Sequence, residues 1–409
     1  MEMEKKSRFT FDAEYHGVAK ICVVGVGGGG GNALNSMIRN GLKSVEFMAI
    51  NTDAQDLSKS LASHKIQAGR KLTKGLGAGA RPEIGIQAML ECSDEVETAL
   101  DGYDLIFVTA GMGGGTGTGG VGIVADIARR LGILVVAIVT KPFEFENKKR
   151  MEYALKGIDR LKHHVDTLIV IPNERLLDIS DESTNLFEAF KLADDVLGNA
   201  ARGISDLITK TGYMNLDFAD VSTTIKDSGT AVIGVGTGEL ETGAASITLE
   251  AISSPLMDGV SFSGARNVLV NLTAGSLPMK EMQAAMAVIK DEAGAEAEII
   301  TGVVVDDDMD GKLRVTVIAT GFEQKHSQDN TQAPKVLASE PKSFGYKGED
   351  NLKVLDIPAW ERRGFAQSKK NSSFSEQKIR YLNEDDAKSA TEEASHSETT
   401  PAFLRKMMD

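Results

Sequence analysis

Two glycine-rich runs in this 409-residue chain have the residue types and spacing that point most directly to chemistry. Residues 113–119 read Gly-Gly-Gly-Thr-Gly-Thr-Gly and come directly after the apolar run 104–109. Gly25 and residues 27–31 follow a second apolar run at 20–24. Consecutive glycines leave backbone N–H groups that no side chain shields, and a concavity of such groups binds phosphate. The two runs predict a nucleotide polyphosphate that is held from two sides.

The elements that must position these loops alternate between strand-like and helical patterns from about residue 18 to residue 180. We expect strands at residues 20–24, 45–50, 104–109, 133–139 and 167–171. This alternation is typical of a doubly wound α/β sheet, in which ligands bind at the carboxyl ends of parallel strands. Both glycine runs follow such ends, as do residues 51–53 and 140–142, so the sequence predicts a Rossmann-like nucleotide-binding domain.

A long helix is predicted after this domain, because apolar residues recur at helical spacing from Ser183 to Thr209. Ser183 is the expected N-cap and Gly212 the expected stop, followed by a polar loop that ends at Asp220. The pattern then predicts a second, smaller α/β domain, with strands at 229–235, 267–273, 299–305 and 313–320 and helices at 243–253 and 279–293.

The composition is that of a soluble globular protein, with 42% hydrophobic and 25% charged residues. A formal net charge of −14 argues against a general nucleic-acid binder. Two cysteines imply no disulfide framework, which fits a reducing cytosol. The longest apolar run, residues 133–139, is far too short to cross a bilayer. We therefore expect a cytoplasmic protein without direct membrane insertion.

The tail after Gly321 is polar, and its composition cannot bury enough surface to fold. Two apolar islands interrupt it, at 354–360 and 401–406, and such islands are typical of docking peptides that order on binding. Position favours the second island, with 354–362 as the alternative. The expected organisation is a flexible arm at 1–17, a nucleotide-binding domain at 18–182, a central helix and catalytic loop at 183–220, a C-terminal α/β domain at 221–321, a disordered linker at 322–400 and a docking peptide at 401–409.

The first glycine run, taken alone, favours another class of nucleotide. Gly25-x-Gly27-x-x-Gly30 satisfies the dinucleotide fingerprint, and Asp53 follows the next strand, where a ribose-binding acid would lie. That pattern by itself indicates an NAD(P)-dependent oxidoreductase. The second run, at 113–119, has no role in a dinucleotide fold. The sequence also contains no Gly-x-x-x-x-Gly-Lys-Ser/Thr motif, so it is not a P-loop protein.

Five segments in one order make the chain resemble the tubulin superfamily and, within it, the FtsZ family of bacterial cell-division GTPases. They are Asn-Thr-Asp at 51–53, Gly-Leu-Gly-Ala-Gly-Ala at 75–80, the glycine run at 113–119, Lys-Pro-Phe at 141–143 and Asn-Leu-Asp-Phe-Ala-Asp at 215–220. The resemblance covers about residues 18–321. It implies GTP and GDP as ligands, with Mg²⁺ on the phosphates and no side chain assigned as a metal ligand.

The same resemblance implies a nucleotide-binding set. Its loop residues are Gly28, Gly29, Gly30, Gly31, Asn32, Asp53, Ala78, Gly79, Ala80, Gly115, Thr116 and Gly117. Glu146 and Arg150 would contact ribose and phosphate, and Phe190 would stack on guanine. Asn173 and Asp194 would pair with the edge of the base. A carboxylate suits that edge, because guanine has N1–H and 2-amino donors that adenine lacks.

The resemblance also implies that Asn215, Asp217 and Asp220 are catalytic, with both aspartates polarising the attacking water. From residue types alone, a capped and solvated turn is the more frequent reading. Asp217 follows Asp194 by more than twenty residues of mostly helical pattern, so the two lie on the order of 30 Å apart. If these carboxylates act on a γ-phosphate, it belongs to the nucleotide of a neighbouring subunit. A head-to-tail contact of this kind that does not close produces a filament.

The resemblance therefore implies a cytoplasmic GTPase that polymerises head to tail at the mid-cell division ring. Membrane-tethering division adaptors and regulators would bind its C-terminal peptide. Three alternatives stay open at this point. They are a filament-forming relative that serves plasmid partition or cell shape, an NAD(P)-dependent oxidoreductase, and a scaffold that binds GTP without hydrolysing it.

Overall fold

The computed structural model describes residues 19–322, except 179–183, 211, 215, 258–261 and 295. These residues belong to one compact unit, Met1–His326. The predicted arm at 1–17 and docking peptide at 401–409 lie outside the described residues, as does the predicted linker apart from Phe322. No helix among the described residues is long and apolar enough to span a membrane.

Six parallel strands form the first part of the sheet, in the order β3-β2-β1-β4-β5-β6. They are β1 (Ile21–Val26), β2 (Glu46–Asn51), β3 (His64–Gln67), β4 (Leu105–Gly111), β5 (Leu134–Lys141) and β6 (Thr167–Pro172). This is the strand order of the doubly wound dinucleotide-binding sheet, so the predicted fold class is confirmed. The sequence did not predict β3, a four-residue edge strand with two exposed residues, because it lacks a continuous apolar run.

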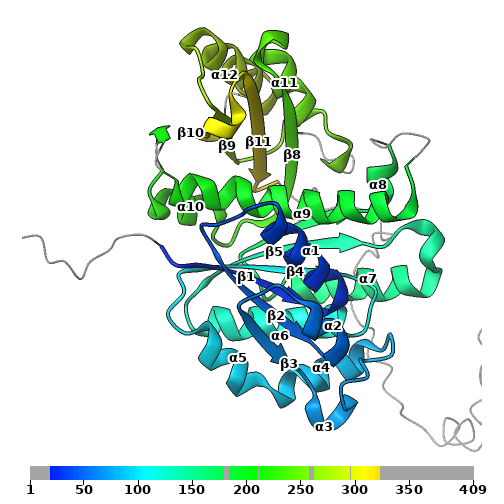
Figure 1. The fold of residues 1–409 in the computed structure, drawn as a ribbon. Helices are drawn as coiled ribbons and strands as arrows, with labels where there is room; N and C mark the ends of the chain where they lie inside the picture. Colours follow the sequence, from blue (N-terminus) through cyan, green and yellow to red (C-terminus); the bar gives the residue numbers. More distant parts are fainter. Residues whose placement is uncertain are drawn as a thin grey trace, which may run out of the picture. The chain divides into compact units, whose positions relative to one another are not determined.

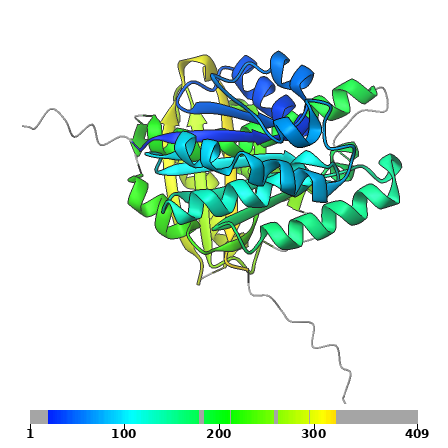
Figure 2. The ribbon, with the colours of Figure 1, turned by 90° about the horizontal axis from the view of Figure 1, so that it is seen from below.

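Helices cover both faces of these strands (Figures 1 and 2). They are α1 (Gly27–Arg39), α2 (Ala54–Lys59), α3 (Arg70–Thr73), α4 (Pro82–Glu91), α5 (Ser93–Leu100), α6 (Thr116–Arg130) and α7 (Lys148–Leu161). Successive residues of β1 pack in two different apolar cores. Val23 lies in the core that contains Leu34 of α1, and Val24 lies in the core that contains Val121 of α6. Burial on both faces explains why the strands read as continuous apolar runs.

The long helix α9 (Leu186–Thr209) begins after Asn185, so the predicted start at Ser183 is wrong. Asn185 Oδ1 accepts a hydrogen bond from the Glu188 backbone N–H at 3.1 Å, and Glu188 Oε2 accepts one from the Asn185 N–H at 2.9 Å. This reciprocal capping box satisfies two backbone donors at the helix start, which fixes the start at this position. Ser183 itself lies outside the described residues.

The segment after α9 is more ordered than the predicted polar loop from Gly212 to Asp220. It contains a short strand, β7 (Gly212–Met214), and α10 (Phe218–Ile225), which has Asp220 in its first turn. Gly212 is also not the helix stop, because α9 ends at Thr209 with Lys210 as its C-cap. A Cβ at Gly212 would lie 2.0 Å from the Val303 carbonyl oxygen, so glycine permits close strand pairing there.

The C-terminal part continues the same sheet, since β6 pairs in parallel with β8. The order onward is β8-β11-β9-β10-β7, in which β9 and β10 are parallel and the other pairs antiparallel. The elements are β8 (Gly229–Glu239), α11 (Ala244–Ile252), β9 (Asn267–Ala274), α12 (Met279–Ala293), β10 (Glu298–Val305) and β11 (Lys312–Thr320). They match the predicted strands and helices to within a few residues at each end.

The helix α9 contacts both parts of the sheet. Its residues Ile204 and Leu207 share one apolar core with Phe107 of β4 and Ile318 of β11. The carbonyl of Gly203 also accepts a hydrogen bond of 3.0 Å from the Asn271 side chain on β9. The helix is therefore packed against both parts.

Candidate nucleotide site

A hollow of about 320 Å³ lies at the carboxyl ends of β1, β4 and β5, which is large enough for a small-molecule ligand. Both predicted glycine runs line it, because β1 leads directly into α1 and β4 leads through residues 112–115 into α6. The predicted site residues at this hollow are Gly28, Gly29, Asn32, Gly115, Thr116, Gly117, Glu146, Arg150, Asn173, Phe190 and Asp194. The structure thus brings together residues that are up to 166 positions apart in the sequence (194 − 28).

Close backbone contacts explain why these loops require glycine. A Cβ at Gly30 would lie 2.5 Å from the Thr109 carbonyl oxygen, and one at Gly117 would lie 2.9 Å from the Gly111 carbonyl oxygen. The absent side chains let the first turns of α1 and α6 approach the end of β4. Backbone N–H groups at a helix start, together with the helix dipole, favour an anion at such a position.

We predict opposite effects of alanine at two adjacent glycines of α1. Gly30→Ala is expected to lower the free energy of unfolding by about 1–3 kcal/mol, because the new methyl group overlaps a backbone carbonyl. Gly31→Ala is the matched control, since a Cβ there has no heavy atom within 4 Å, and it is expected to be neutral or stabilising by up to about 1 kcal/mol. Urea denaturation of both variants tests this, and equal stabilities would contradict it.

Three side chains lie at the α9 side of the hollow. Asn173 follows β6 and is only 5% exposed, yet its Oδ1 has no hydrogen-bond partner among the described residues. A buried acceptor without a partner is costly, so this atom fits a ligand that brings an N–H donor. Burial, and to a lesser extent the neighbouring Asp195, raise the pKa of Asp194 to about 7. The Phe190 ring packs edge-on to Phe143, with ring centroids 5.4 Å apart, and remains partly exposed.

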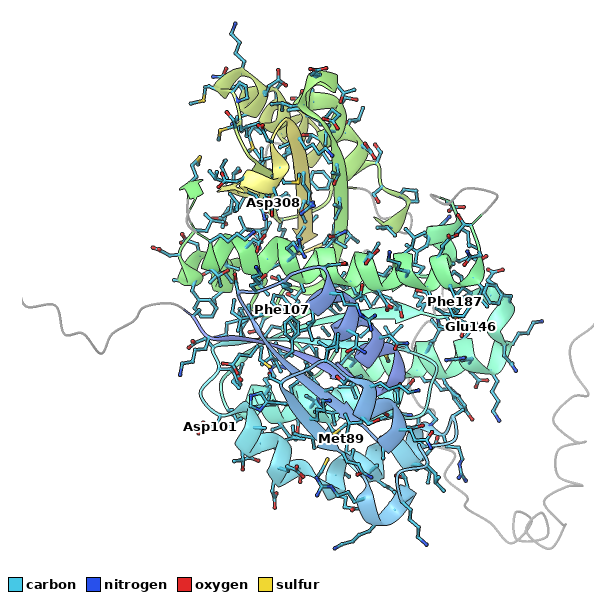
Figure 3. All side chains as sticks on the ribbon, in the orientation of Figure 1. Met89, Asp101, Phe107, Glu146, Phe187 and Asp308 are labelled. Atoms are coloured by element: carbon cyan, nitrogen blue, oxygen red, sulfur yellow. The ribbon has the colours of Figure 1, made fainter. Side chains whose placement is uncertain are left out.

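Glu146 and Arg150 form an ion pair of 2.9 Å at the start of α7. Figure 3 shows Glu146 on the same side of the molecule as Phe187, near the start of α9. The Glu146 side chain is 10% exposed, and its Oε1 accepts a hydrogen bond from the Phe143 N–H at 3.0 Å. Arg150 is half exposed and faces Gly113, where a Cβ would lie 2.7 Å from the arginine Cγ. Glu146 is therefore a built part of the site and not a solvated surface charge.

A second hollow adjoins the first and shares Gly28, Gly115 and Thr116 with it. Its lining adds three predicted residues, Asp53, Ala78 and Ala80. Asp53 Oδ1 accepts hydrogen bonds from the backbone N–H groups of two following residues, Gln55 at 2.9 Å and Asp56 at 3.1 Å, so it caps α2. The dinucleotide fingerprint assigns Asp53 to ribose binding, whereas in this structure its side chain caps a helix.

Some predicted residues do not line the site, and some side-chain contacts at the site were not predicted. Gly30, Gly31 and Gly79 line neither of these two hollows. The Thr118 hydroxyl accepts a hydrogen bond from the Gly113 N–H at 2.8 Å, so this group stabilises the loop itself. Thr52 was not singled out as a site side chain, although its hydroxyl lies 2.6 Å from that of Thr116.

Apolar residues of the lining, such as Met112 and Leu197, also went unpredicted. The type of an apolar residue does not indicate that it lines a binding site. For Met112, the position just after a strand was the sole indication that it lies at the site. These residues shape the hollow without offering a polar contact to a ligand.

The predicted catalytic residues lie away from this hollow. Asp217 and Asp220 are exposed at the start of α10, at the opposite end of α9 from α8 (Glu174–Leu177) (Figure 1). The 24 residues of α9 span about 36 Å. Asp217 occupies the N-cap position of α10, but its side chain makes no capping hydrogen bond within the described part of the chain. The alternative interpretation of this segment as a capped turn is therefore not supported by a cap. Asn215 lies outside the described residues.

The fold and the hollow define a nucleotide-binding protein of the doubly wound α/β class, joined by one long helix to a second α/β part. Residues 20–181 match the model of the tubulin/FtsZ family GTPase domain, and residues 229–323 match that of the FtsZ family C-terminal domain. The chain belongs to the tubulin/FtsZ family and contains its GTPase domain. The predicted family is thereby confirmed, and with it GTP or GDP as the nucleotide in general terms.

Solved structures agree with this assignment. A dimer of FtsZ from M. jannaschii, determined empty, is 43% identical, with a TM-score of 0.71, and the match covers 74% of this chain and 88% of that one. CetZ2 from Haloferax volcanii, in a GTPγS-bound protofilament, is 23% identical with a TM-score of 0.64, over 75% of this chain and 94% of that one. The second likeness shows the fold alone.

Proposed function

We propose that this chain hydrolyses GTP at sites that form between successive subunits of a head-to-tail filament. The carrying observation is that the nucleotide hollow lies along the first half of α9, as far as Leu197, whereas Asp217 and Asp220 follow the other end of this helix. A γ-phosphate bound at Gly28 and Gly115 is out of reach of these carboxylates in the same subunit. The underside of the next subunit can bring them to it, which makes turnover depend on assembly.

Within the hollow, each side chain has a proposed task. The backbone N–H groups of the glycine loops bind the phosphates, and Arg150 supports them. Asn173 and Asp194 accept hydrogen bonds from guanine, and Phe190 stacks on the base. Asp217 and Asp220 of the neighbour, with Asn215, orient the attacking water, and the two carboxylates polarise it by accepting hydrogen bonds from it.

We propose that Mg²⁺ accompanies the bound GTP and offsets the charge of its phosphates. The described residues contain no group of three carboxylate, histidine or cysteine side chains that could hold a metal ion alone. Mg²⁺ requires no such group, since it commonly keeps several waters and binds through one or two carboxylates together with substrate phosphates. Asp53 and Asp56 line the second hollow and are the carboxylates available there.

The proposed cellular role is cell division, with a cytoplasmic protein that assembles at the mid-cell ring. Support comes from family membership and from the dimeric state of the M. jannaschii FtsZ named above. The proposed domain limits are 18–182, 183–220 and 221–321. Membrane-tethering adaptors and regulators are proposed to bind the peptide at 401–409.

Removal of residues 401–409 is expected to leave GTP-dependent assembly unchanged and to weaken binding to adaptors at least about tenfold, because the peptide would supply most of the contact. Pelleting measures assembly, and binding to a purified division adaptor measures affinity. A truncation that binds as well as the full chain would move the docking site to 354–362.

Light scattering tests the proposed assembly. The full chain with GTP and Mg²⁺ should scatter strongly and then lose the signal as GTP is consumed. GDP, or no nucleotide, should give little scattering. Assembly that is equal under all three conditions would contradict a GTP-driven filament, and turnover without any assembly would contradict the shared site.

A further inference from the structure

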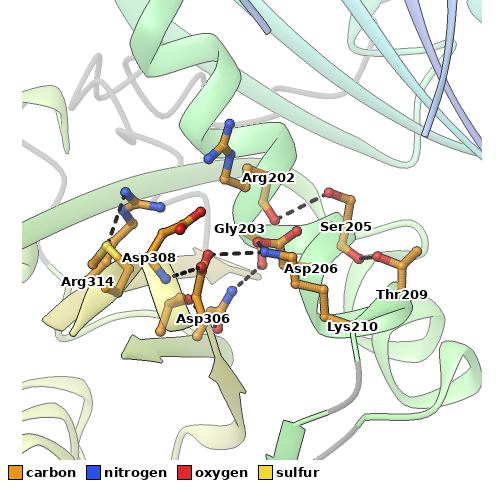
Figure 4. Close-up of polar contacts among 12 residues, drawn as sticks. Arg202, Gly203, Ser205, Asp206, Thr209, Lys210, Asp306, Asp308 and Arg314 are labelled. Atoms are coloured by element: carbon orange, nitrogen blue, oxygen red, sulfur yellow. Dashed lines mark hydrogen bonds and ion pairs between the residues drawn. The ribbon is translucent and has the colours of Figure 1, made fainter. Parts of the chain in front are cut away.

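A charged cluster joins the end of α9 to the C-terminal strands, at a place that none of the proposed roles uses (Figure 4). Lys210, the C-cap of α9, places its Nζ 3.1 Å from Asp206 Oδ2 and 3.3 Å from Asp306 Oδ2. Asp206 lies one turn earlier on the same helix. Asp306 directly follows β10. One ammonium group thus links two elements that are distant in sequence.

Burial distinguishes this cluster from an ordinary surface ion pair. The side chains of Asp206, Lys210 and Asp306 are 3%, 33% and 23% exposed. Burial raises the pKa of the Asp206 carboxyl, and the positive charges of Lys210 and Arg202 oppose that rise. Asp206 therefore needs its lysine, since a buried charge without a partner is strongly destabilising. Asp306 is less buried, and its charge also favours the protonated form of the nearby Arg314.

Asp306 is itself held in place by the C-terminal strands. Its backbone N–H donates to the Ala274 carbonyl of β9 at 3.1 Å, and its Oδ1 accepts from the Asp308 N–H at 3.2 Å. The ion pair with Lys210 consequently fixes the last turn of α9 against a rigid support. A buried ion pair adds little net stability, because the cost of desolvating its charges offsets their attraction.

The chain that leaves Lys210 leads to Asp217 within seven residues (217 − 210). On the way, β7 pairs with β10, with Met214 opposite Val303 and Gly212 opposite Val304. The register shifts between Val303 and Val304, so this short ladder is irregular. Two attachments thus hold the chain just before α10, the β7–β10 ladder and the Lys210–Asp306 pair, while Val221 and Ile225 of α10 pack in the core.

We propose that Lys210 and Asp306 are positioning residues, which hold the end of α9 against β10 so that Asp217 and Asp220 meet the neighbour's nucleotide. The inference rests on the proposed function. It adds that the aspartates are placed by an ion pair at the far end of the helix that carries Asp194. A small displacement of a catalytic group costs a large factor in rate, while binding at the other end of α9 is unaffected.

Asp306→Asn in the full-length protein is the first test. Asparagine keeps an oxygen for the Asp308 N–H and leaves Asp206 paired with Lys210, but it removes the negative charge that binds Lys210. We expect kcat at saturating GTP to fall at least about fivefold, with KM, the Kd of a fluorescent GTP analogue and the pelleted fraction all within about twofold of wild type. A merely structural defect would change assembly and binding together with kcat.

Lys210→Met and Lys210→Arg complete the comparison. Lys210→Met is expected to lower kcat as Asp306→Asn does, and the double variant to be no slower than the slower single variant. Lys210→Arg retains the charge and should recover most of the rate. Lys312→Met is the matched control, because it removes an exposed ion pair of 3.8 Å with Glu239 in the same strands and should leave kcat unchanged.

The outcomes separate the two proposals. Wild-type turnover that is independent of assembly would overturn the proposed function. Assembly-dependent wild-type turnover, combined with an unchanged kcat in Asp306→Asn, would overturn the positioning role alone. If Lys210→Met does not fold, Asp306→Asn and Lys210→Arg still decide it, since both leave Asp206 with a positive partner.

Discussion

Asp217→Ala is expected to abolish GTP turnover, with kcat lowered at least about 100-fold, and to leave GTP affinity within about twofold of wild type. The carboxylate is exposed at the start of α10 and does not line the nucleotide hollow, so its removal changes no contact to GTP within one subunit. Turnover at saturating GTP and equilibrium binding of a fluorescent analogue measure the two quantities. Equal losses of both would mean that the segment shapes the hollow of its own subunit.

Mixing provides the control for this prediction. Asn32 is exposed and lines the hollow, so Asn32→Asp places a negative charge beside the phosphates and should impair GTP binding. In a mixture, the Asp217→Ala subunit supplies an intact hollow and the Asn32→Asp subunit supplies intact aspartates. Turnover of the mixture should exceed the sum of the separate proteins. Activity that is merely additive would contradict a shared site.

Asp194→Asn is expected to weaken GTP binding about 10- to 100-fold and to remove the pH dependence of binding. The amide can accept one hydrogen bond from guanine but lacks the charge that strengthens bonds to its N1–H and 2-amino groups. In the free wild-type protein the pKa of Asp194 is about 7, and guanine donors favour the ionised form. Wild-type affinity should therefore rise from pH 6 to 8, by up to about tenfold per unit below 7, and level off above 8.

The stability of the nucleotide-free protein provides an independent check of the same group. The folded pKa of Asp194 lies above its ordinary value of 3.8, so the folded state holds an extra proton between about pH 4 and 7. The contribution of Asp194 to the free energy of unfolding is therefore smallest above pH 7, because the folded state must then bury a charged carboxylate. Asp194→Asn should raise the melting temperature at pH 8 and change it little at pH 4. A melting temperature that falls at pH 8 would contradict the assigned burial cost.

Much of the fold follows from local sequence signals. The strands of the first part are buried on both faces, so each appears as an apolar run, and a glycine run after β1 or β4 marks the turn into a helix. The prediction missed β3 because its pairing with β2 comes from tertiary context and not from its own residues. It also chose Ser183 as the N-cap of α9, because serine and asparagine are both favoured N-cap residues, whereas the capping box of Asn185 and Glu188 fixes the start at Asn185.

The site was less predictable than the fold, for a physical reason. The polar contacts of the site depend on which strand ends lie next to one another in the sheet. The sequence indicates that these residues lie at the carboxyl edge of the sheet, but it does not indicate which of them contact each other there. The hydroxyl contact between Thr52 and Thr116 joins residues 64 positions apart, and the ion pair of Lys210 with Asp306 joins residues 96 apart. Neither has a local signature. Asp53 illustrates the converse, since a motif gave it a ligand role and the structure uses it as a helix cap.

The central claim is that one molecule builds the pocket and the next completes it. GTP turnover per molecule, measured with Mg²⁺ over a wide range of protein concentration, tests this most directly. We predict that the rate per molecule is near zero in dilute, monomeric protein and rises steeply once filaments form. A strictly monomeric sample that cleaves GTP as fast per molecule as the assembled protein would contradict the account.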